Sequence, residues 1–175
     1  TEIKFKLIKP ATESQLLVVS LQDLKNLAKI VKLILEQKPE SFESYDNYTI
    51  DVAHHFLPKL LMKLTGGIPK LVLLVEFSGD IESELKQKCL TTQKLLRQFK
   101  ARSQIVSSVQ AKKYWTIRRE SFNLLRKHSQ GLRAAPFIDD LVVKPSELPE
   151  FLPKLQSILK RYHLTYTIAG HIGDG

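Results

Sequence analysis

The sequence has little cysteine and no long apolar run, and each shortage excludes a class of protein. One cysteine in 175 residues excludes a disulfide scaffold and a cysteine-rich metal site. The longest apolar run, residues 71–75, is far shorter than the roughly 20 residues that span a membrane. The N-terminal residues lack the apolar core of a signal peptide. A hydrophobic content of 43% excludes disordered and collagen-like chains and predicts one domain, or two small subdomains that share a core.

Acidic residues are nearly missing from one stretch of the chain. Residues 86–133 contain 13 basic residues and one acidic residue, Glu120, whereas the remainder contains 14 basic and 17 acidic residues. This stretch therefore accounts for the whole net charge of +9. Concentrated positive charge suits an anionic partner, and it is also typical of a solvated helix face. The stretch has few aromatic residues and no recognition-module signature, so we expect no nucleic-acid partner.

Apolar periodicity predicts an α+β fold. The first half gives, in order, a strand at 16–20, a helix at 21–37, a strand at 41–45, a helix at 48–64, a strand at 70–77, a helix at 81–99 and a strand at 105–109. Pro58 would kink or split the helix at 48–64. Without that helix, the order predicts a split βαβ, or ferredoxin-like, unit.

The second half repeats this pattern less clearly. It gives a helix at 111–128, a strand at 137–143, a helix with Ser146 as N-cap, and a strand at 162–169. We therefore predict duplicated ferredoxin-like subdomains at 1–110 and 111–175, with antiparallel sheets backed by helices.

Glycine is scarce, yet three of the seven glycines lie in the last six residues, Gly-His-Ile-Gly-Asp-Gly. Glycines there permit a close backbone approach or a positive φ, as a loop that touches a ligand needs. The order Gly-x-Gly-x-x-Gly of a dinucleotide site is absent. Within this loop His171 is a candidate metal ligand, base or carboxylate partner, and a hydrogen-bonded structural histidine is the alternative.

Residues 114–120, Tyr-Trp-Thr-Ile-Arg-Arg-Glu, place two arginines beside aromatic residues on an expected helix. Arginine holds a carboxylate through two parallel hydrogen bonds, which lysine does not. Trp115 and Arg118 are three residues apart and share one helix face, whereas Arg119 points roughly 100° away from Arg118. Arg118 is therefore a candidate for binding a substrate carboxylate, and an ion pair to surface acids is the alternative.

Three other features are weaker candidates. His54 and His55 are neighbours on an expected helix, so their side chains diverge and suit one metal poorly. Cys89 has lysines nearby but no accompanying base, which favours a buried structural thiol. Asp139 and Asp140 are either a ligand pair or an acidic pair at a strand entry. The sequence contains no nucleophile elbow, Walker loop or metal-binding helix motif.

Taken in order, these pieces resemble the C-terminal domain of the FAD-linked oxidases. That family includes cytochrome-linked D-lactate dehydrogenase, the flavin subunit of glycolate oxidase and D-2-hydroxyglutarate dehydrogenase. Residues 3–10 resemble the strand that leaves the flavin domain, and residues 71–79 resemble the family's central strand. Residues 115–118 resemble its Trp-x-x-Arg element, 140–149 the strand-to-helix passage after it, and 170–175 the start of its most specific motif.

The resemblance implies a substrate-and-cap domain of a longer protein, with FAD bound mainly by a domain that lies upstream. It implies hydride transfer to flavin from a D-2-hydroxy acid of the D-lactate, glycolate or D-2-hydroxyglutarate type. Arg118 corresponds to the arginine that holds the substrate carboxylate. His171 corresponds to the first active-site histidine, which in some members ligates a divalent metal such as Zn or Mn; the second histidine is absent here. The isolated chain is then expected to be inactive and to bind FAD poorly.

The resemblance also sets the expected partners. They are a small 2-hydroxy acid, the FAD-binding domain, an electron-acceptor protein or quinone, and a second copy in a homodimer. The expected location is the cytoplasm, including the periphery of the inner membrane.

Two alternative functions stay open. One is a non-catalytic ferredoxin-like module that binds an acidic protein or RNA through residues 86–133, and the other is a relative of alkyl-glycerone-phosphate synthase.

Overall fold

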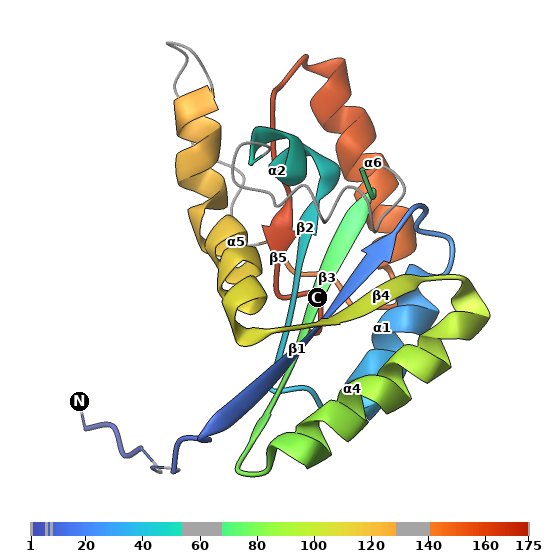
Figure 1. The fold of residues 1–175 in the computed structure, drawn as a ribbon. Coiled ribbons are helices and arrows are strands. Elements are labelled where there is room, and N and C mark those ends of the chain that lie inside the picture. Colours follow the sequence, from blue (N-terminus) through green and yellow to red (C-terminus); the bar gives the residue numbers. More distant parts are fainter. Residues whose placement is uncertain (1, 6, 8, 54–67, 129–140, 175) are drawn as a thin grey trace.

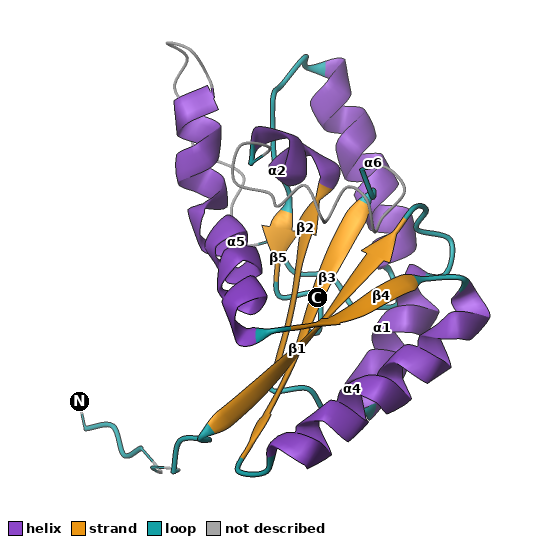
Figure 2. Cartoon of the chain, viewed as in Figure 1, coloured by secondary structure: helices purple, strands orange, loops and turns teal. Residues whose placement is uncertain are grey.

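The computed structural model describes residues 2–5, 7, 9–53, 68–128 and 141–174, and shows an α+β fold built on one antiparallel sheet (Figure 1 and Figure 2). The strands are β1 (Glu13–Leu21), β2 (Ser41–Asp46), β3 (Leu71–Gly79), β4 (Arg102–Val106) and β5 (Ala169–Gly170). The helices are α1 (Leu27–Glu36), α2 (Asn47–Val52), α4 (Glu82–Leu96), the 3-10 turn η1 (Arg97–Phe99), α5 (Ser108–His128) and α6 (Leu148–Arg161). No helix in the described ranges is long and apolar enough to cross a membrane.

The predicted α+β class and the split βαβ order of the first half are confirmed. The strands lie in the order β4-β1-β3-β2-β5, and every neighbouring pair is antiparallel. The first four strands therefore have the arrangement expected of a split βαβ unit. The last strand, β5, adds to the same sheet by pairing with β2. The division of the chain into subdomains at residue 110 stays a prediction.

Side chains of the central strand β3 alternate between two covered faces of the sheet. Leu71, Leu73 and Val75 pack with α1, α4 and α6, whereas Val72 and Leu74 pack with α2 and α5. Successive residues of a strand point to opposite faces, so a strand covered on both sides is apolar at nearly every position. This explains why the sequence of β3 is a continuous apolar run rather than an alternating one.

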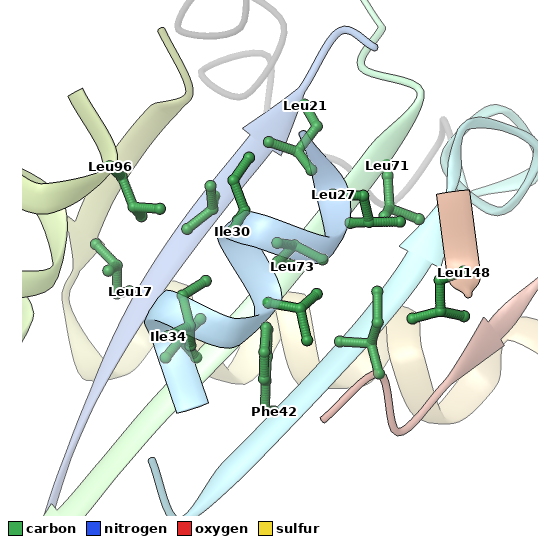
Figure 3. Packing of buried hydrophobic residues seen from close by; sticks show 14 of the residues in the cluster. Leu17, Leu21, Leu27, Ile30, Ile34, Phe42, Leu71, Leu73, Leu96 and Leu148 are labelled. Carbon is green, nitrogen blue, oxygen red and sulfur yellow. The ribbon is translucent and has the colours of Figure 1, made fainter. Parts of the chain in front are cut away.

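The larger apolar cluster lies between the sheet and α1 (Figure 3). Leu27, Ile30 and Ile34 come from successive turns of α1 and point at the sheet. There they meet Leu17 of β1 and Leu73 of β3, both fully buried. The spacing of three and four residues on α1 is the helical periodicity that the sequence displayed.

Two predicted boundaries in the first half are wrong, for local reasons. The helix expected from residue 21 begins at Leu27, because β1 continues to Leu21 and the Asp23 side chain accepts a hydrogen bond from the Lys25 backbone at 3.0 Å, which forms a turn. The strand expected at 105–109 lies at Arg102–Val106. A capping box ends it, since Ser107 N–H donates to Gln110 Oε1 at 3.1 Å and Gln110 N–H donates to Ser107 Oγ at 3.4 Å.

The second half departs further from prediction. Ser146 is not the N-cap of α6, because the helix begins after Glu147 with Pro149 in its first turn, where a missing N–H costs little. Of the strand predicted at 162–169, only Ala169 pairs in the sheet. The backbone turns at His163 (φ 53°) in a Schellman-type end to α6, and before Ala169 it is the Ile168 carbonyl that contacts β2, where it accepts from Asp46 N–H at 3.0 Å.

The remaining differences involve segments outside the described residues. Residues 141–143 of the strand predicted at 137–143 form no strand, and 137–140 lie outside the described residues. The helix predicted at 48–64 is described only as α2, which begins at Asn47 and ends at Val52.

The side chain of Asp46 starts α2 from a buried position. Its Oδ1 accepts hydrogen bonds from the backbone N–H and the hydroxyl of Thr49, both at 2.9 Å. The other oxygen, Oδ2, is buried with no hydrogen-bond partner among the described residues. Burial raises the pKa of Asp46 to about 6, although the bonds from Thr49 oppose the shift.

This buried carboxyl makes stability depend on pH. The folded-state pKa lies above the unfolded value of about 4, so folding binds a proton and stability falls as the pH rises from about 4 to about 6. Two pKa units correspond to about 3 kcal/mol. We expect Asp46→Asn to remove most of this decline in the free energy of unfolding. Urea unfolding measured from pH 4 to pH 7 checks this. The exposed Asp51→Asn, on the same helix, is the matched control and should keep the wild-type slope; equal slopes in all three proteins would contradict the assignment.

Candidate active site

The site is centred on Glu43, a carboxylate buried in the sheet. Glu43 lies on β2 beside Leu74 of β3, and its side chain is 8% exposed. It points to the sheet face that α5 covers, whereas its neighbour Phe42 packs into the cluster under α1. A buried carboxylate is costly unless it is paired with hydrogen-bond donors or cations. Partners for it come from two other segments of the chain.

The first partner is Arg118 of α5. Its Nε donates to Glu43 Oε2 at 2.9 Å, and the side chain is 23% exposed. One turn earlier on the same helix face, Trp115 Nε1 donates to Glu76 Oε1 of β3 at 3.0 Å. The shared face of Trp115 and Arg118 predicted from their spacing is therefore confirmed, and each side chain contacts a glutamate on one of two adjacent strands.

The second partner is His171, in the loop that follows β5. Its Nδ1 pairs with Glu43 Oε1, while the imidazole remains 73% exposed. Pairing between β5 and β2 aligns Gly170 with Ser44 and Ala169 with Tyr45, so the residue after β5 arrives next to Glu43. Arg118 and His171, predicted as separate candidates, are thus brought together on one carboxylate.

The glycine-rich loop packs closely on the sheet and on α1. A Cβ added at Gly173 would lie 3.2 Å from Phe42 Cδ1 and 3.3 Å from Leu35 Cδ2, whereas one added at Gly170 would meet nothing within 4 Å. Gly173 N–H also donates to the Phe42 carbonyl at 3.4 Å, and Ile172 is buried. The predicted close backbone approach is therefore confirmed at Gly173 but not at Gly170.

The outer nitrogens of both side chains are left without a hydrogen bond. Within the described part of the chain, none is formed by Arg118 Nη1 or Nη2 or by His171 Nε2. A guanidinium offers paired donors that match the geometry of a carboxylate, and an imidazole nitrogen accepts or donates a proton near neutral pH. The arrangement therefore suits a ligand that carries a carboxylate and an exchangeable proton.

Of the other sequence candidates, only Cys89 lies among the described residues, and it is not part of this site. Burial raises the pKa of the Cys89 thiol to about 12, and Cys89 packs in the cluster on the opposite face of the sheet, as a structural thiol would. His54, His55, Asp139 and Asp140 lie outside the described residues.

Sequence reasoning missed the two glutamates. Glu43 lies in the expected strand at 41–45, and Glu76 interrupts the apolar run of the central strand. Glutamate is rarely buried without a partner, so its presence in a strand covered on both faces is the signal that would have found it.

Two helix ends of the described residues do not suit the pyrophosphate of FAD, and the described residues show no metal site. Glu82 and Glu84 in the first turn of α4, and Glu150 in that of α6, oppose the binding of a pyrophosphate at these helix ends. Within the described ranges no group of three or more His, Cys, Asp or Glu side chains is placed to hold a metal ion. Glu43 also occupies Nδ1 of His171. The metal expected at His171 therefore finds no support in this part of the chain.

Comparison with known proteins identifies the family. Residues 11–175 match the family model of the FAD linked oxidases, C-terminal domain. The chain belongs to this family. It is 26% identical over 161 residues to a D-2-hydroxyglutarate dehydrogenase of Pseudomonas putida, a match that covers 81% of this chain and 15% of that protein. A protein of the same name from Escherichia coli is 19% identical over 188 residues, covering 100% of this chain and 18% of that protein.

A third similar protein, from Pantoea ananatis and also named D-2-hydroxyglutarate dehydrogenase, is 22% identical over 156 residues, covering 82% of this chain and 15% of that protein. The chain thus spans less than a fifth of the length of these curated relatives. The predicted family is confirmed.

The two loop glycines give a matched test of how the site is packed. We expect Gly173→Ala to lower the unfolding free energy by about 1 kcal/mol, because its methyl group overpacks the ring of Phe42. Gly170→Ala should be neutral or slightly stabilising, because its methyl group enters open space. Urea unfolding of both variants checks this difference, and equal stability of the two would show that the loop is not held against β2.

Proposed function

We propose that this chain is the substrate-binding part of an FAD-dependent oxidoreductase that oxidises a D-2-hydroxy acid. The observation that carries the proposal is the convergence of Arg118 and His171 on Glu43, with the outer nitrogens of both groups open. Membership of the FAD-linked oxidase family supports the cofactor. In this proposal the flavin is held mainly by the FAD-binding domain that the family resemblance implies.

The chemistry divides between the two side chains. Oxidation of a 2-hydroxy acid to a 2-oxo acid removes a hydride from C2 and a proton from the hydroxyl group, and FAD supplies the hydride acceptor when it is bound. Arg118 binds the carboxylate through Nη1 and Nη2. In its neutral form His171 carries its proton on Nδ1, because Glu43 only accepts hydrogen bonds, and Nε2 then accepts the hydroxyl proton.

The basic stretch has a different role from Arg118. Apart from Arg118, every described basic side chain within residues 86–127 is exposed. These exposed charges suit an acidic electron-acceptor protein or attraction of anionic substrates at long range. The partly buried Arg118, with a carboxylate partner of its own, is the residue that we assign to substrate binding.

The first test of this function is anaerobic reduction of the full-length protein. We expect a yellow flavoprotein whose visible absorbance bleaches on addition of D-2-hydroxyglutarate, D-lactate or glycolate, with D-2-hydroxyglutarate tested first because the relatives carry that name. The absorbance spectrum is followed during titration with each acid. A yellow protein that none of them bleaches would remove the substrate assignment. A colourless protein that does not take up FAD would favour the binding-module alternative.

The second test compares two neighbouring arginines. Arg118→Lys replaces the paired donors with a point charge, so we expect a fall of about 10- to 100-fold in kcat/KM, mainly through a higher KM. Arg119→Lys, at the adjacent exposed position of α5, should keep kcat/KM within about twofold, in the range of a surface change. Steady-state kinetics with the acid that bleaches the flavin checks both variants. Equal kinetics in the two would remove Arg118 from the site.

A further inference from the structure

One buried carboxylate is shared between two groups that face the substrate. Glu43 Oε2 accepts from Arg118 Nε at 2.9 Å, and Oε1 pairs with His171 Nδ1. Side-chain exposure rises from 8% at Glu43 to 23% at Arg118 and 73% at His171. The carboxylate therefore lies beneath the two groups and holds them from the protein side.

Each contact leaves only one edge of the partner group available. Arg118 commits its Nε edge to Glu43, so the guanidinium plane is oriented and the terminal pair of nitrogens remains for a ligand. His171 commits Nδ1, so its tautomer and ring orientation are set and Nε2 remains. Both choices are the ones that carboxylate binding and proton acceptance need.

Glu43 is far more firmly held than the groups that it contacts. Its strand, β2, lies between β3 and β5, and Asp46 at the end of the strand caps α2. Arg118 has a long side chain with several rotatable bonds, and His171 follows a strand of only two residues. Fixing such groups by a rigid partner reduces the conformational entropy that substrate binding would otherwise cost.

Glu76 offers an internal comparison. It lies on the neighbouring strand β3, under the same helix, and its carboxylate accepts from Trp115 Nε1 at 3.0 Å. Within the described residues it contacts neither Arg118 nor His171. Replacing Glu76 by glutamine therefore measures the structural effect of removing a carboxylate charge beneath α5.

We propose that Glu43 is a positioning residue for both groups, fixing the guanidinium of Arg118 for carboxylate binding and, through Nδ1, the ring of His171 so that Nε2 remains for the ligand. This inference rests on the proposed function, and it adds a residue to which the family resemblance assigned no role.

The experiment is a double-mutant cycle in the full-length flavoprotein with D-2-hydroxyglutarate. Glu43→Gln presents an amide that satisfies only one of its two donor partners, so we expect KM to rise and kcat to fall, each by about 10-fold. In the Arg118→Lys background Glu43→Gln should raise KM little further. In the His171→Gln background it should lower kcat little further, because a positioning residue acts through its partner.

Glu76→Gln is the control, and it should leave both kinetic constants within about twofold. The dissociation constant for the product-like 2-oxoglutarate, measured by calorimetry, gives a readout without turnover and should rise in Glu43→Gln by the factor seen in KM. If Glu43→Gln does not fold, Glu43→Asp replaces it in the same double-mutant cycle. The aspartate side chain keeps the charge but is too short to reach both partners.

The outcomes separate this inference from the proposed function. Loss of activity in Arg118→Lys and His171→Gln, with Glu43→Gln behaving like Glu76→Gln, would overturn the positioning role alone. If the fold-losses of the single variants multiply in both double variants, the positioning role is overturned too, because the effect of Glu43→Gln would then be structural and independent of Arg118 and His171. Unchanged kinetics in Arg118→Lys and His171→Gln would overturn the proposed function itself.

Discussion

The buried carboxylate of Glu43 constrains three parts of the fold at once. It lies on β2, between β3 and β5, yet its partners are 75 residues away on α5 and 128 residues away after β5. A buried charge without partners is strongly destabilising, so the docking of α5 and of the glycine-rich loop must satisfy both oxygens. Apolar packing alone tolerates small shifts of a helix, whereas hydrogen bonds from Arg118 and Trp115 to two strands fix where α5 lies.

The two faces of the sheet differ in what they bury. The face under α1, α4 and α6 buries an almost wholly apolar cluster. It includes every second residue of β3 from Leu71 to Phe77. The opposite face carries the smaller cluster together with Glu43 and Glu76. A well-packed apolar face provides the stability that makes buried carboxylates tolerable on the other face. Arg118 on α5 and His171 in the loop after β5 are thus both paired with a carboxylate on the sheet.

Sequence periodicity predicted the elements of the first half because those elements are locally determined. The apolar run of β3 and the three-and-four spacing of α1 need no distant partner to be recognised. The second half depended on long-range pairing. Residues 164–168 have the composition of a strand, but among them only the Ile168 carbonyl meets β2, where it accepts from Asp46 N–H at 3.0 Å, and the assigned strand is limited to Ala169 and Gly170. The capping box of Ser107 and Gln110 was readable in the sequence and would have placed the start of α5 correctly.

The candidate site, too, depends on contacts between residues that are far apart in the sequence, and local sequence signals do not show such contacts. Motif resemblance nominated Arg118 and His171 as candidates, but a motif of contiguous residues says nothing about the residues that lie beneath it, and Glu43 belongs to neither segment. Charge counting pointed to the whole stretch of residues 86–133, where most basic side chains are simply exposed. What distinguishes Arg118 is that its charge is partly buried and already paired along one edge. A lone exposed arginine gains little from a ligand in water, whereas one oriented by a buried carboxylate presents its free edge without first losing entropy.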